Sequence, residues 1–296
     1  MTEKTRHYSH GELRAVFFRK YLTLARAAVD PRLRKPRMNA GLIAEIVAEY
    51  EALYRLPEFA PPPRRIFMLW QQGWDAAPEL VRRCAESWRE QNPGWELHLL
   101  DETAVAEHAS RYAEFVTPNA RRPARSNLAR ISLLLDHGGV WADATLFCVR
   151  PLDDWLPRVM QAGYFMFANP RPYRSSDSWF IAAQAGAPIL VALRNLFAQY
   201  WAWVSRPHIY FWMHYLLEYL TETDASAAET WREMPKIPAR GPLILSNYAF
   251  DKAAPQQVFD LIASRTIPVV KLSHKWRFEG SLVGTPLGVL TGLEKL

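Results

Sequence analysis

The sequence predicts an α/β fold with a parallel sheet, preceded by a helical extension. Three observations lead to this fold class. First, an apolar run, a loop, an amphipathic helix and a second apolar run follow one another between residues 65 and 100; this is the order of a βαβ unit, which requires parallel strands. Second, a later helical segment leads through Gly-Gly into another apolar strand near residue 140. Third, the length of 296 residues suffices for one such domain with small additions.

The amino-terminal part is expected to be a helical extension over residues 1–60, and the main domain to span 61–296. Three consecutive prolines at 61–63 predict a stiff linker between them. Ten Lys or Arg and three Asp or Glu give residues 1–40 a charge of +7, whereas the whole chain carries +6. Apolar and basic residues alternate at helical spacing within 10–37. This pattern fits either a packed accessory helix or a helix lying on an anionic membrane.

The first strand is expected at 65–70, where the residues are almost all apolar, and a loop follows at 71–75. A helix is predicted over 78–91, because its apolar residues recur at helical spacing and Asn-Pro-Gly stops it at 92–94. The second strand is expected at 95–100. The remaining expected elements are helices at 103–115, 126–137, 189–204 and 208–220, and strands at 140–147, 164–168, 179–183 and 268–272.

The composition excludes several classes of protein. Hydrophobic residues make up 49% and charged residues 22%, which is globular rather than disordered. Two distant cysteines, Cys84 and Cys148, disfavour a disulfide framework or a zinc site and favour a reducing compartment. We see no secretory signal and no run long enough to cross a membrane, so a cytoplasmic location is expected, with peripheral contact at the inner face of the plasma membrane as an addition. No nucleic-acid-binding motif is present.

The chemistry is expected where strands end, because ligands of open α/β sheets bind beyond the carboxyl ends of the strands. Asp143 stands at such a position, after a helix, a Gly-Gly turn and an apolar strand start. A lone carboxylate there can hold a divalent cation against a diphosphate, although it can also simply cap a turn. Asn127 and Arg130 lie three residues apart on one helix face, and Trp70 stands at the end of the first strand, where it could stack on a nucleobase.

The segment from 126 to 145, which reads SNLARISLLLDHGGVWADAT, carries a resemblance to a known family. It resembles the signature of capsular polysaccharide synthesis glycosyltransferases, which are relatives of the sugar transferases with a DXD sugar-binding motif. That signature reads Ser-Asp-x-x-Arg, an apolar helix, Gly-Gly, an aromatic residue and an Asp-containing strand. Segments 65–73, 151–155, 210–215 and 271–275 also look similar, so that the resemblance covers roughly residues 60 to 285.

The resemblance implies a Rossmann-like nucleotide-diphospho-sugar transferase (type A glycosyltransferase) fold, a nucleotide-sugar donor, and Mn²⁺ or Mg²⁺ as cofactor. By position it implies a catalytic set of Asp143, Arg130 and Asn127. It implies donor binding by Trp70, Gln71, Gly73, Ser126, Gly138, Gly139, Trp141, Lys271 and Lys275. It implies metal binding by Asp143, His214 and His274. An aromatic wall for the acceptor is expected from some of Trp179, Tyr210, Phe211 and Trp212.

Two residues depart from the family pattern. Asn127 replaces the Asp of Ser-Asp-x-x-Arg and loses its charge, and Thr145 replaces the second Asp of the DXD motif. The expected function is transfer of a hexose from a nucleotide-sugar to a capsular or other cell-surface polysaccharide or glycolipid. The alternative is a degenerate transferase that binds a nucleotide-sugar or glycan as a non-catalytic scaffold. A nucleotide-binding oxidoreductase is disfavoured, because the loop at 71–75 lacks the G-x-G-x-x-G fingerprint.

Overall fold

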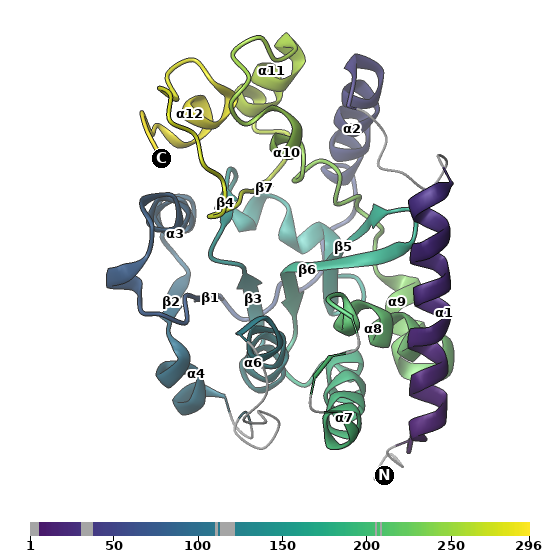
Figure 1. Ribbon diagram of the computed structural model, residues 1–296. Coiled ribbons are helices and arrows are strands. Elements are labelled where there is room, and N and C mark those ends of the chain that lie inside the picture. The colour runs from purple at the N-terminus through teal and green to yellow at the C-terminus, as the bar shows by residue number, and fades with distance from the viewer. Residues whose placement is uncertain (1–5, 31–37, 110–111, 113–121, 205, 208) are drawn as a thin grey trace.

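A five-stranded mixed sheet organises the molecule, in the order β2-β1-β3-β6-β5, and a separate two-stranded sheet pairs β4 with β7 (Figure 1). The computed structural model describes residues 6–30, 38–109, 112, 122–204, 206–207 and 209–296. The strands are β1 (Arg65–Leu69), β2 (Glu96–Leu100), β3 (Gly139–Ala142), β4 (Leu146–Cys148), β5 (Tyr164–Arg171), β6 (Arg174–Ala183) and β7 (Val269–Lys271).

Helices surround this sheet and form a second group at the carboxyl-terminal end. They are α1 (His10–Val29), α2 (Ala40–Leu53), α3 (Glu79–Gln91), α4 (Glu102–His108), α6 (Arg122–His137), α7 (Pro188–Trp203), α8 (Trp212–Thr223), α9 (Ala225–Glu233), α10 (Leu245–Tyr248), α11 (Gln256–Ser264) and α12 (Pro286–Thr291). Short 3-10 helices lie at Trp74–Ala76, Leu152–Asp154 and Leu156–Val159.

The βαβ unit that the sequence predicts is present. The last four residues of β1 are buried, and β1 pairs in parallel with both β2 and β3. Helix α3 begins after Pro78 and buries Leu80 and Trp88 against the sheet side, while Asn92 ends the helix. The indole Nε1 of Trp88 donates to the carbonyl of Leu146 at 2.7 Å, which ties α3 to the second sheet. The predicted α/β class is therefore confirmed.

The sheet differs from the prediction in two ways. Only β2, β1 and β3 run parallel, because β6 pairs antiparallel with both β3 and β5. The expected strand at 140–147 is also two strands: the chain turns at Asp143, whose carbonyl accepts from the amide of Leu146 at 2.8 Å, and continues in the other sheet. The turn places Asp143 at the carboxyl end of β3, as the sequence predicts.

Other boundaries move. Strands β5 and β6 extend toward each other to form one long hairpin, so residues 174–178 belong to a strand instead of a loop. Helix α8 begins at Trp212 rather than at 208, and residue 208 itself lies outside the described residues. Of the helix predicted at 103–115, α4 covers the first part, and residues 113–115 are outside the described residues. The prediction also omits the helices after residue 224.

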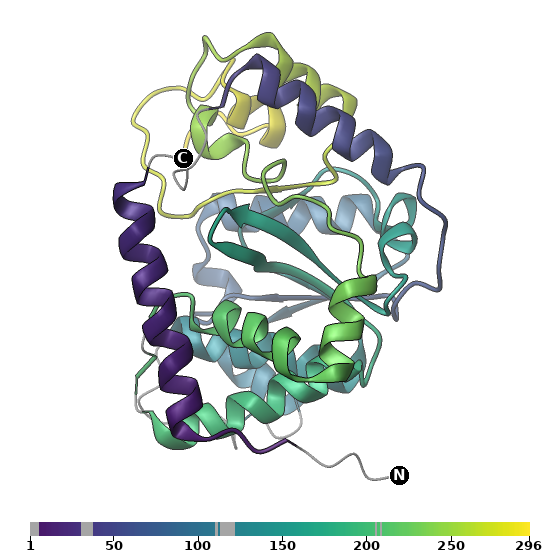
Figure 2. The ribbon, with the colours of Figure 1, turned by 90° about the vertical axis from the view of Figure 1, so that its right-hand side faces the viewer.

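The amino-terminal helices share the core of the rest of the chain. Helix α1 stands along one side of the molecule and packs on α7 and α8, whereas α2 lies at the other end beside α11 (Figures 1 and 2). Buried residues of both helices, such as Phe17 and Ile46, belong to one continuous hydrophobic cluster with the main sheet. The division at residue 60 stays a prediction. No helix among the described residues is long and apolar enough to span a membrane.

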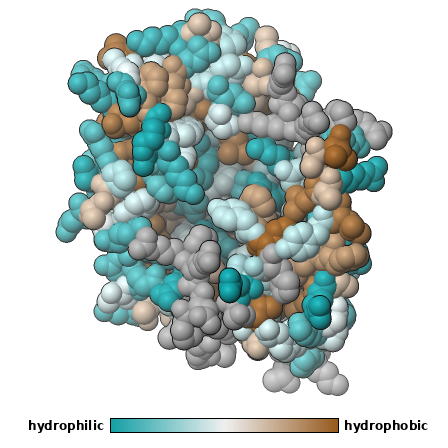
Figure 3. All heavy atoms as spheres, in the orientation of Figure 1, coloured by the Kyte–Doolittle hydropathy of each residue, from teal (hydrophilic) through white to brown (hydrophobic). Residues whose placement is uncertain are grey.

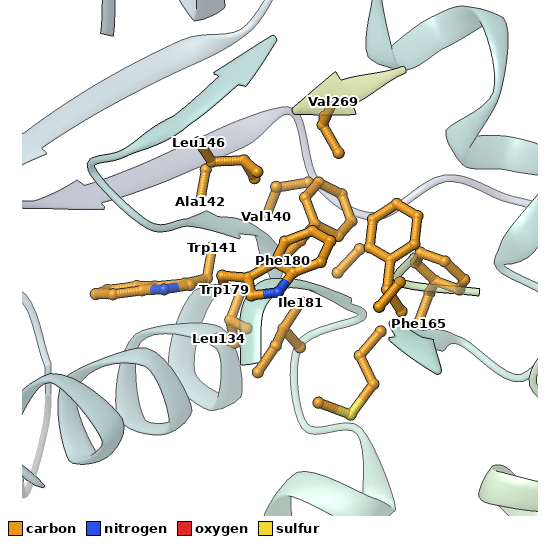
Figure 4. Packing of buried hydrophobic residues seen from close by; sticks show 14 of the residues in the cluster. Leu134, Val140, Trp141, Ala142, Leu146, Phe165, Trp179, Phe180, Ile181 and Val269 are labelled. Carbon is orange, nitrogen blue, oxygen red and sulfur yellow. The ribbon is translucent and has the colours of Figure 1, made fainter. Parts of the chain in front are cut away.

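Aromatic side chains fill the core between β3, β5 and β6. The ring of Trp155 lies 5.2 Å from that of Phe180 and 6.1 Å from that of Phe165. Figure 4 shows Val140 of β3, Phe165 of β5 and Phe180 of β6 among the side chains of this core. Dense packing of this kind holds β3 and β6 in fixed register, and this register sets the geometry at the strand ends where Asp143 lies.

Candidate functional site

A cavity of about 300 Å³ opens at the carboxyl end of β3, between β6, the start of α6 and the start of α8. Parts of the chain that are far apart in sequence converge on it. Its lining residues are Ser126, Asn127, Arg130, Asp143, Asp177, Ser178, Trp179, Tyr210, Phe211, His214 and Lys271. Six of these are predicted catalytic, donor-binding or metal-binding residues, and three belong to the expected aromatic wall. Their convergence is a finding, although the role of each stays a prediction.

Asp143 is held in a defined orientation. Its Oδ1 accepts from the indole Nε1 of Trp141 at 2.9 Å and from Nη2 of Arg130 at 3.2 Å. Its backbone amide donates to the carbonyl of Trp179 on β6 at 2.9 Å. The side chain keeps 28% of its surface exposed. Because both donors reach the same oxygen, Oδ2 is the carboxylate oxygen that can face a ligand in the cavity.

Arg130 is buried, with 5% of its surface exposed, and its donors are largely occupied. Nε and Nη2 donate to the carbonyl and hydroxyl oxygens of Ser126 at 3.3 and 3.0 Å, and Nη1 donates to the carbonyl of Ser178 at 2.6 Å. With the bond to Asp143, four of the five N–H groups of a guanidinium are engaged. Arg130 therefore fixes Asp143, and one N–H of its guanidinium remains for a ligand.

A second carboxylate, Asp177, faces the same cavity, and the sequence prediction missed it. It lies in β6, is 9% exposed, and its Oδ2 is 3.1 Å from Nη2 of Arg174. Arg174 in turn lies over the ring of Phe211 at 4.0 Å. Burial raises the pKa of the Asp177 carboxyl, and the neighbouring Arg174 opposes this shift. The signal in the sequence was the polar run Arg-Ser-Ser-Asp-Ser before Trp179, which reads as a loop unless the hairpin is recognised.

Lys271 brings positive charge to the cavity from β7. Its Nζ donates to the hydroxyl of Thr145 at 2.5 Å and to the carbonyl of Leu272 at 3.0 Å. Thr145 occupies the position of the second Asp of the DXD motif, so in this chain that position supports a lysine. Lys275, which was assigned to the donor together with Lys271, is exposed and is not among the residues that line the cavity.

The three predicted metal ligands do not all line one cavity: Asp143 and His214 do, and His274 does not. His214 lines the cavity, but its Nδ1 and Nε2 face the hydroxyls of Ser176 and Ser178 at 3.4 and 3.5 Å. Burial lowers the pKa of His214 well below its usual value, and Arg174 and Arg130 add to the effect. His274 lies outside the cavity, with its ring 5.3 Å from that of Trp70. In the part of the chain that the structure describes, no three His, Cys, Asp or Glu side chains could hold a metal ion together.

The loop after β1 lies beside Ala144, the residue that follows Asp143. Trp70 packs against a small cluster that contains Ala144, the residue after Asp143, and it is half-buried. Its indole Nε1 is buried without a hydrogen-bond partner among the described residues. Gln71 follows in the turn, and Gly73 has a φ of 85°, which favours glycine because it is left-handed. Trp70, Gln71 and Gly73 are not among the residues that line the cavity. Their assignment to the donor stays a prediction.

The two glycines of the signature lie away from the cavity, at the amino end of β3. A Cβ on Gly139 would be 2.5 Å from the carbonyl oxygen of Arg65, and one on Gly138 would be 2.7 Å from the amide of Ala185. Their φ angles are 102° and 64°. The close approach that these glycines allow is therefore to the neighbouring backbone. Their assignment to the donor stays a prediction. Trp141, also assigned to the donor, is buried beneath Arg130, whose guanidinium lies 5.0 Å from the indole ring centre.

The aromatic wall is present in part. Trp179, Tyr210 and Phe211 line the cavity, and Tyr210 is 73% exposed. Trp212 is different, since it is 1% exposed and stacks on Tyr200 within the core with ring centres 5.4 Å apart. Three of the four expected aromatic residues could therefore meet a ligand, and the fourth contributes only to packing.

Two curated proteins are similar to part of this chain. The chain is 28% identical over 141 residues to inositol phosphoceramide mannosyltransferase 1 of Schizosaccharomyces pombe, which covers 45% of this chain and 42% of the relative. It is also 28% identical over 160 residues to the O-glycosyltransferase braB of Annulohypoxylon truncatum. That match covers 47% of this chain and 38% of the relative. The chain thus matches only about two fifths of the length of these curated relatives.

Among solved structures, a glycosyltransferase called PaToxG matches 73% of this chain and 84% of its own, with 13% identity and a TM-score of 0.38. Residues 43–282 match the family described as capsular polysaccharide synthesis protein, and this match includes every residue that lines the cavity. It also begins inside α2, within the segment that the sequence assigns to the extension. The chain belongs to the capsular polysaccharide synthesis protein family.

Proposed function

We propose that this chain is a glycosyltransferase that moves a hexose from a nucleotide-sugar to a surface polysaccharide or glycolipid. The observation that carries the proposal is the cavity at the carboxyl end of β3, where the fixed carboxylate of Asp143 and the cation of Lys271 line one space. Family membership and the printed names of two relatives, a mannosyltransferase and an O-glycosyltransferase, support transfer of a sugar.

The charges in the cavity suit a departing diphosphate. During transfer, the bond between the anomeric carbon and the diphosphate oxygen breaks, and a new bond forms to the acceptor oxygen, whose proton leaves. Lys271 would stabilise the negative charge that develops on the diphosphate, which is where preorganised electrostatics contribute most. Asp177 is the candidate to accept the proton, since its raised pKa strengthens it as a base. Tyr210 and Phe211 would flank the acceptor.

A Mg²⁺ or Mn²⁺ ion is part of this proposal only in a restricted form. The described residues do not provide a three-ligand cluster, so the protein alone would hold such an ion weakly. Mg²⁺ is commonly held by one or two carboxylates together with substrate phosphates and water. The free Oδ2 of Asp143 fits that arrangement. An ion bound with the diphosphate would offset the charge of the leaving group.

The alternative, a non-catalytic scaffold, is favoured by one observation: Asn127 lines the cavity at the position where the family pattern has Asp. An amide can hydrogen-bond to a hydroxyl but cannot act as a base.

A cytoplasmic location is also part of the proposal. It is supported by the two cysteines, which are both buried and free.

The test is a panel of nucleotide-sugars with Mn²⁺, Mg²⁺ or EDTA, in which release of nucleoside diphosphate is followed. We expect release from one donor, and we expect Asp143→Ala to abolish it. The matched control is Asp260→Ala, an exposed Asp on α11. If the wild-type protein binds a donor but releases nothing, and Asn127→Asp restores turnover, the scaffold function is correct instead.

A further inference from the structure

Helix α1 has two faces of different character. The inner face buries Leu13, Val16 and Phe17 against α7 and α8. On the same side, Lys20 pairs with Glu218 of α8, and Glu218 in turn accepts from the amide and hydroxyl of Ser175 at 2.9 and 3.0 Å. These contacts attach α1 firmly to the body of the protein and to β6, the strand that carries Asp177. The packing of the inner face is the accessory-helix arrangement that the sequence allows.

The outer face of α1, which is turned away from α7 and α8, is apolar and exposed. Ala15, Phe18, Leu22 and Val29 are separated by three, four and seven residues, so they form one stripe along the helix. Phe18 is 64% exposed, Leu22 57% and Val29 74%. Among the described residues, half of the large hydrophobic side chains that are exposed belong to this helix. The exposed large hydrophobic residues are eight in number among the described residues: Phe18, Tyr21, Leu22, Val29, Tyr210, Val283, Val289 and Leu296.

Arginines border this stripe. At 100° per residue, Arg14 lies on one side of it, and Arg19 and Arg26 lie on the other. All three are exposed. Four acidic residues lie nearby. Glu12 contacts Ser9 and Tyr219, and Asp30 lies 3.9 Å from Arg26. Glu218 and Glu222 line a cavity with Arg19 on the side of α1 that faces α8. The outer face is therefore apolar along its centre and positive along both edges.

We propose that the outer face of α1 docks on the surface of an anionic lipid bilayer. An apolar stripe between cations is the pattern of helices that lie in the plane of a membrane, with the apolar side chains in the acyl boundary and the arginines at the lipid phosphates. Charge complementarity selects the lipid surface, because an uncharged partner would not require arginines on both edges. The proposal concerns described residues 10–29; residues 31–37, which the sequence prediction included, lie outside the described residues.

Docking by this face would bring the cavity close to the membrane. Figure 3 shows hydrophobic residues gathered over α1, on the face of the molecule that carries a central hollow. Tyr210 and Phe211 line the cavity and immediately precede α8, the helix on which α1 packs. An acceptor that is anchored in the bilayer would then approach the cavity without leaving the membrane. This inference goes beyond the proposed function, and the docking itself does not depend on turnover.

The experiment is co-sedimentation of the full chain with vesicles of phosphatidylcholine alone or with about one third phosphatidylglycerol. We expect binding only to the anionic vesicles, and weaker binding as salt increases. Phe18→Ser/Leu22→Ser should weaken binding about tenfold or more, because it removes apolar area from the buried stripe. Arg14→Gln/Arg19→Gln should weaken it about thirtyfold, because each arginine near an anionic surface contributes independently.

Two control variants keep the test sharp. Val283→Ser/Val289→Ser removes exposed apolar side chains elsewhere, and Arg55→Gln/Arg89→Gln removes exposed arginines elsewhere; both should bind like wild type. Release of nucleoside diphosphate from soluble donor should be unchanged in all four variants, so a failure of docking and a failure of the transferase proposal are distinguishable.

Three results would overturn the proposal. The first is equal binding of the wild type to both kinds of vesicle, or to neither. The second is equal binding by the α1 variants and their controls. The third is a dimer in sedimentation velocity that Phe18→Ser/Leu22→Ser dissociates, since this result would assign the face to a second copy of the chain.

Discussion

At the amino end of β3, Gly138 and Gly139 lie against the backbone of neighbouring segments. A Cβ atom added to Gly139 would be only 2.5 Å from the carbonyl oxygen of Arg65. At the carboxyl end of the same strand, Asp143 faces a cavity and keeps 28% of its side chain exposed. Both ends belong to one short signature in the sequence. The comparison teaches that nearby residues of one signature can have separate roles. The glycines allow β3 to pack closely against neighbouring backbone, and the aspartate faces the cavity at the other end of the strand.

The largest effect is expected from a change at the carboxyl end. Asp143→Asn keeps the shape of the side chain but removes the charge that Oδ2 presents to the cavity. Turnover of the donor should fall on the order of 10²–10³-fold, as it does when one electrostatic group is removed from other enzyme sites. The measurement is the rate of nucleoside diphosphate release at saturating donor. A loss of less than threefold would mean that Asp143 serves only to pair with Arg130.

The next effect is expected at the amino end. Gly139→Ala places a methyl group against the carbonyl oxygen of Arg65 at a φ of 102°, so the free energy of unfolding should fall by about 3 kcal/mol. Urea unfolding measures it. Gly73→Ala is the matched control, since its φ is 85° but nothing lies within 4 Å of the added Cβ; it should cost about 1 kcal/mol. Equal losses in the two variants would show that backbone conformation, and not crowding, explains Gly139.

Arg130→Lys sharpens the account of how Asp143 is held. A lysine cannot reach Ser126, Ser178 and Asp143 together, because its donors radiate from one atom. We expect a loss of about 2 kcal/mol in the free energy of unfolding, with some acceptors left unpaired. Arg232→Lys, on the exposed surface of α9, serves as control and should leave stability unchanged. Wild-type stability in Arg130→Lys would contradict a positioning role.

The smallest effect concerns His214. Its pKa in the folded protein is lowered well below 6.5 by burial, so the folded state stays neutral while the unfolded state takes up a proton as pH falls. The stability contribution is thus present above pH 6.5 and is lost as pH falls below it. Between pH 7.5 and 5.5, the wild type should lose about 1 kcal/mol more than His214→Gln. Parallel pH profiles in urea unfolding would show that His214 is solvated.

Much of the fold follows from local pattern. The helix from Glu79 to Gln91 has an apolar face and clear start and stop signals, and the strand at 65–69 is a continuous apolar run. These features are encoded by neighbouring residues. The division of the predicted strand at 140–147 into two strands is not encoded locally. It depends on the pairing of β4 with β7, which lies more than 120 residues later in the chain.

The cavity shows the same limit. Asp143 could be predicted from its place after an apolar strand, whereas His214 and Lys271 were suggested only by the family resemblance. Asp177 was missed because its polar neighbours look like a loop, and only pairing with β5 makes them a strand. The full set of Arg130 contacts was also beyond prediction, since one partner is a carbonyl oxygen of β6.

The most direct test of the central claim is a crystal structure with a nucleotide-sugar analogue in which a methylene group replaces the glycosidic oxygen. We predict that the sugar and diphosphate lie in the cavity beside Asp143 and Lys271, with the base toward Trp70. Other cavities among the described residues include one of about 350 Å³ beside Met38 and Arg240 and one of about 670 Å³ beside Trp276 and Phe278. An analogue bound in either of these, with the Asp143 cavity empty, would contradict the account.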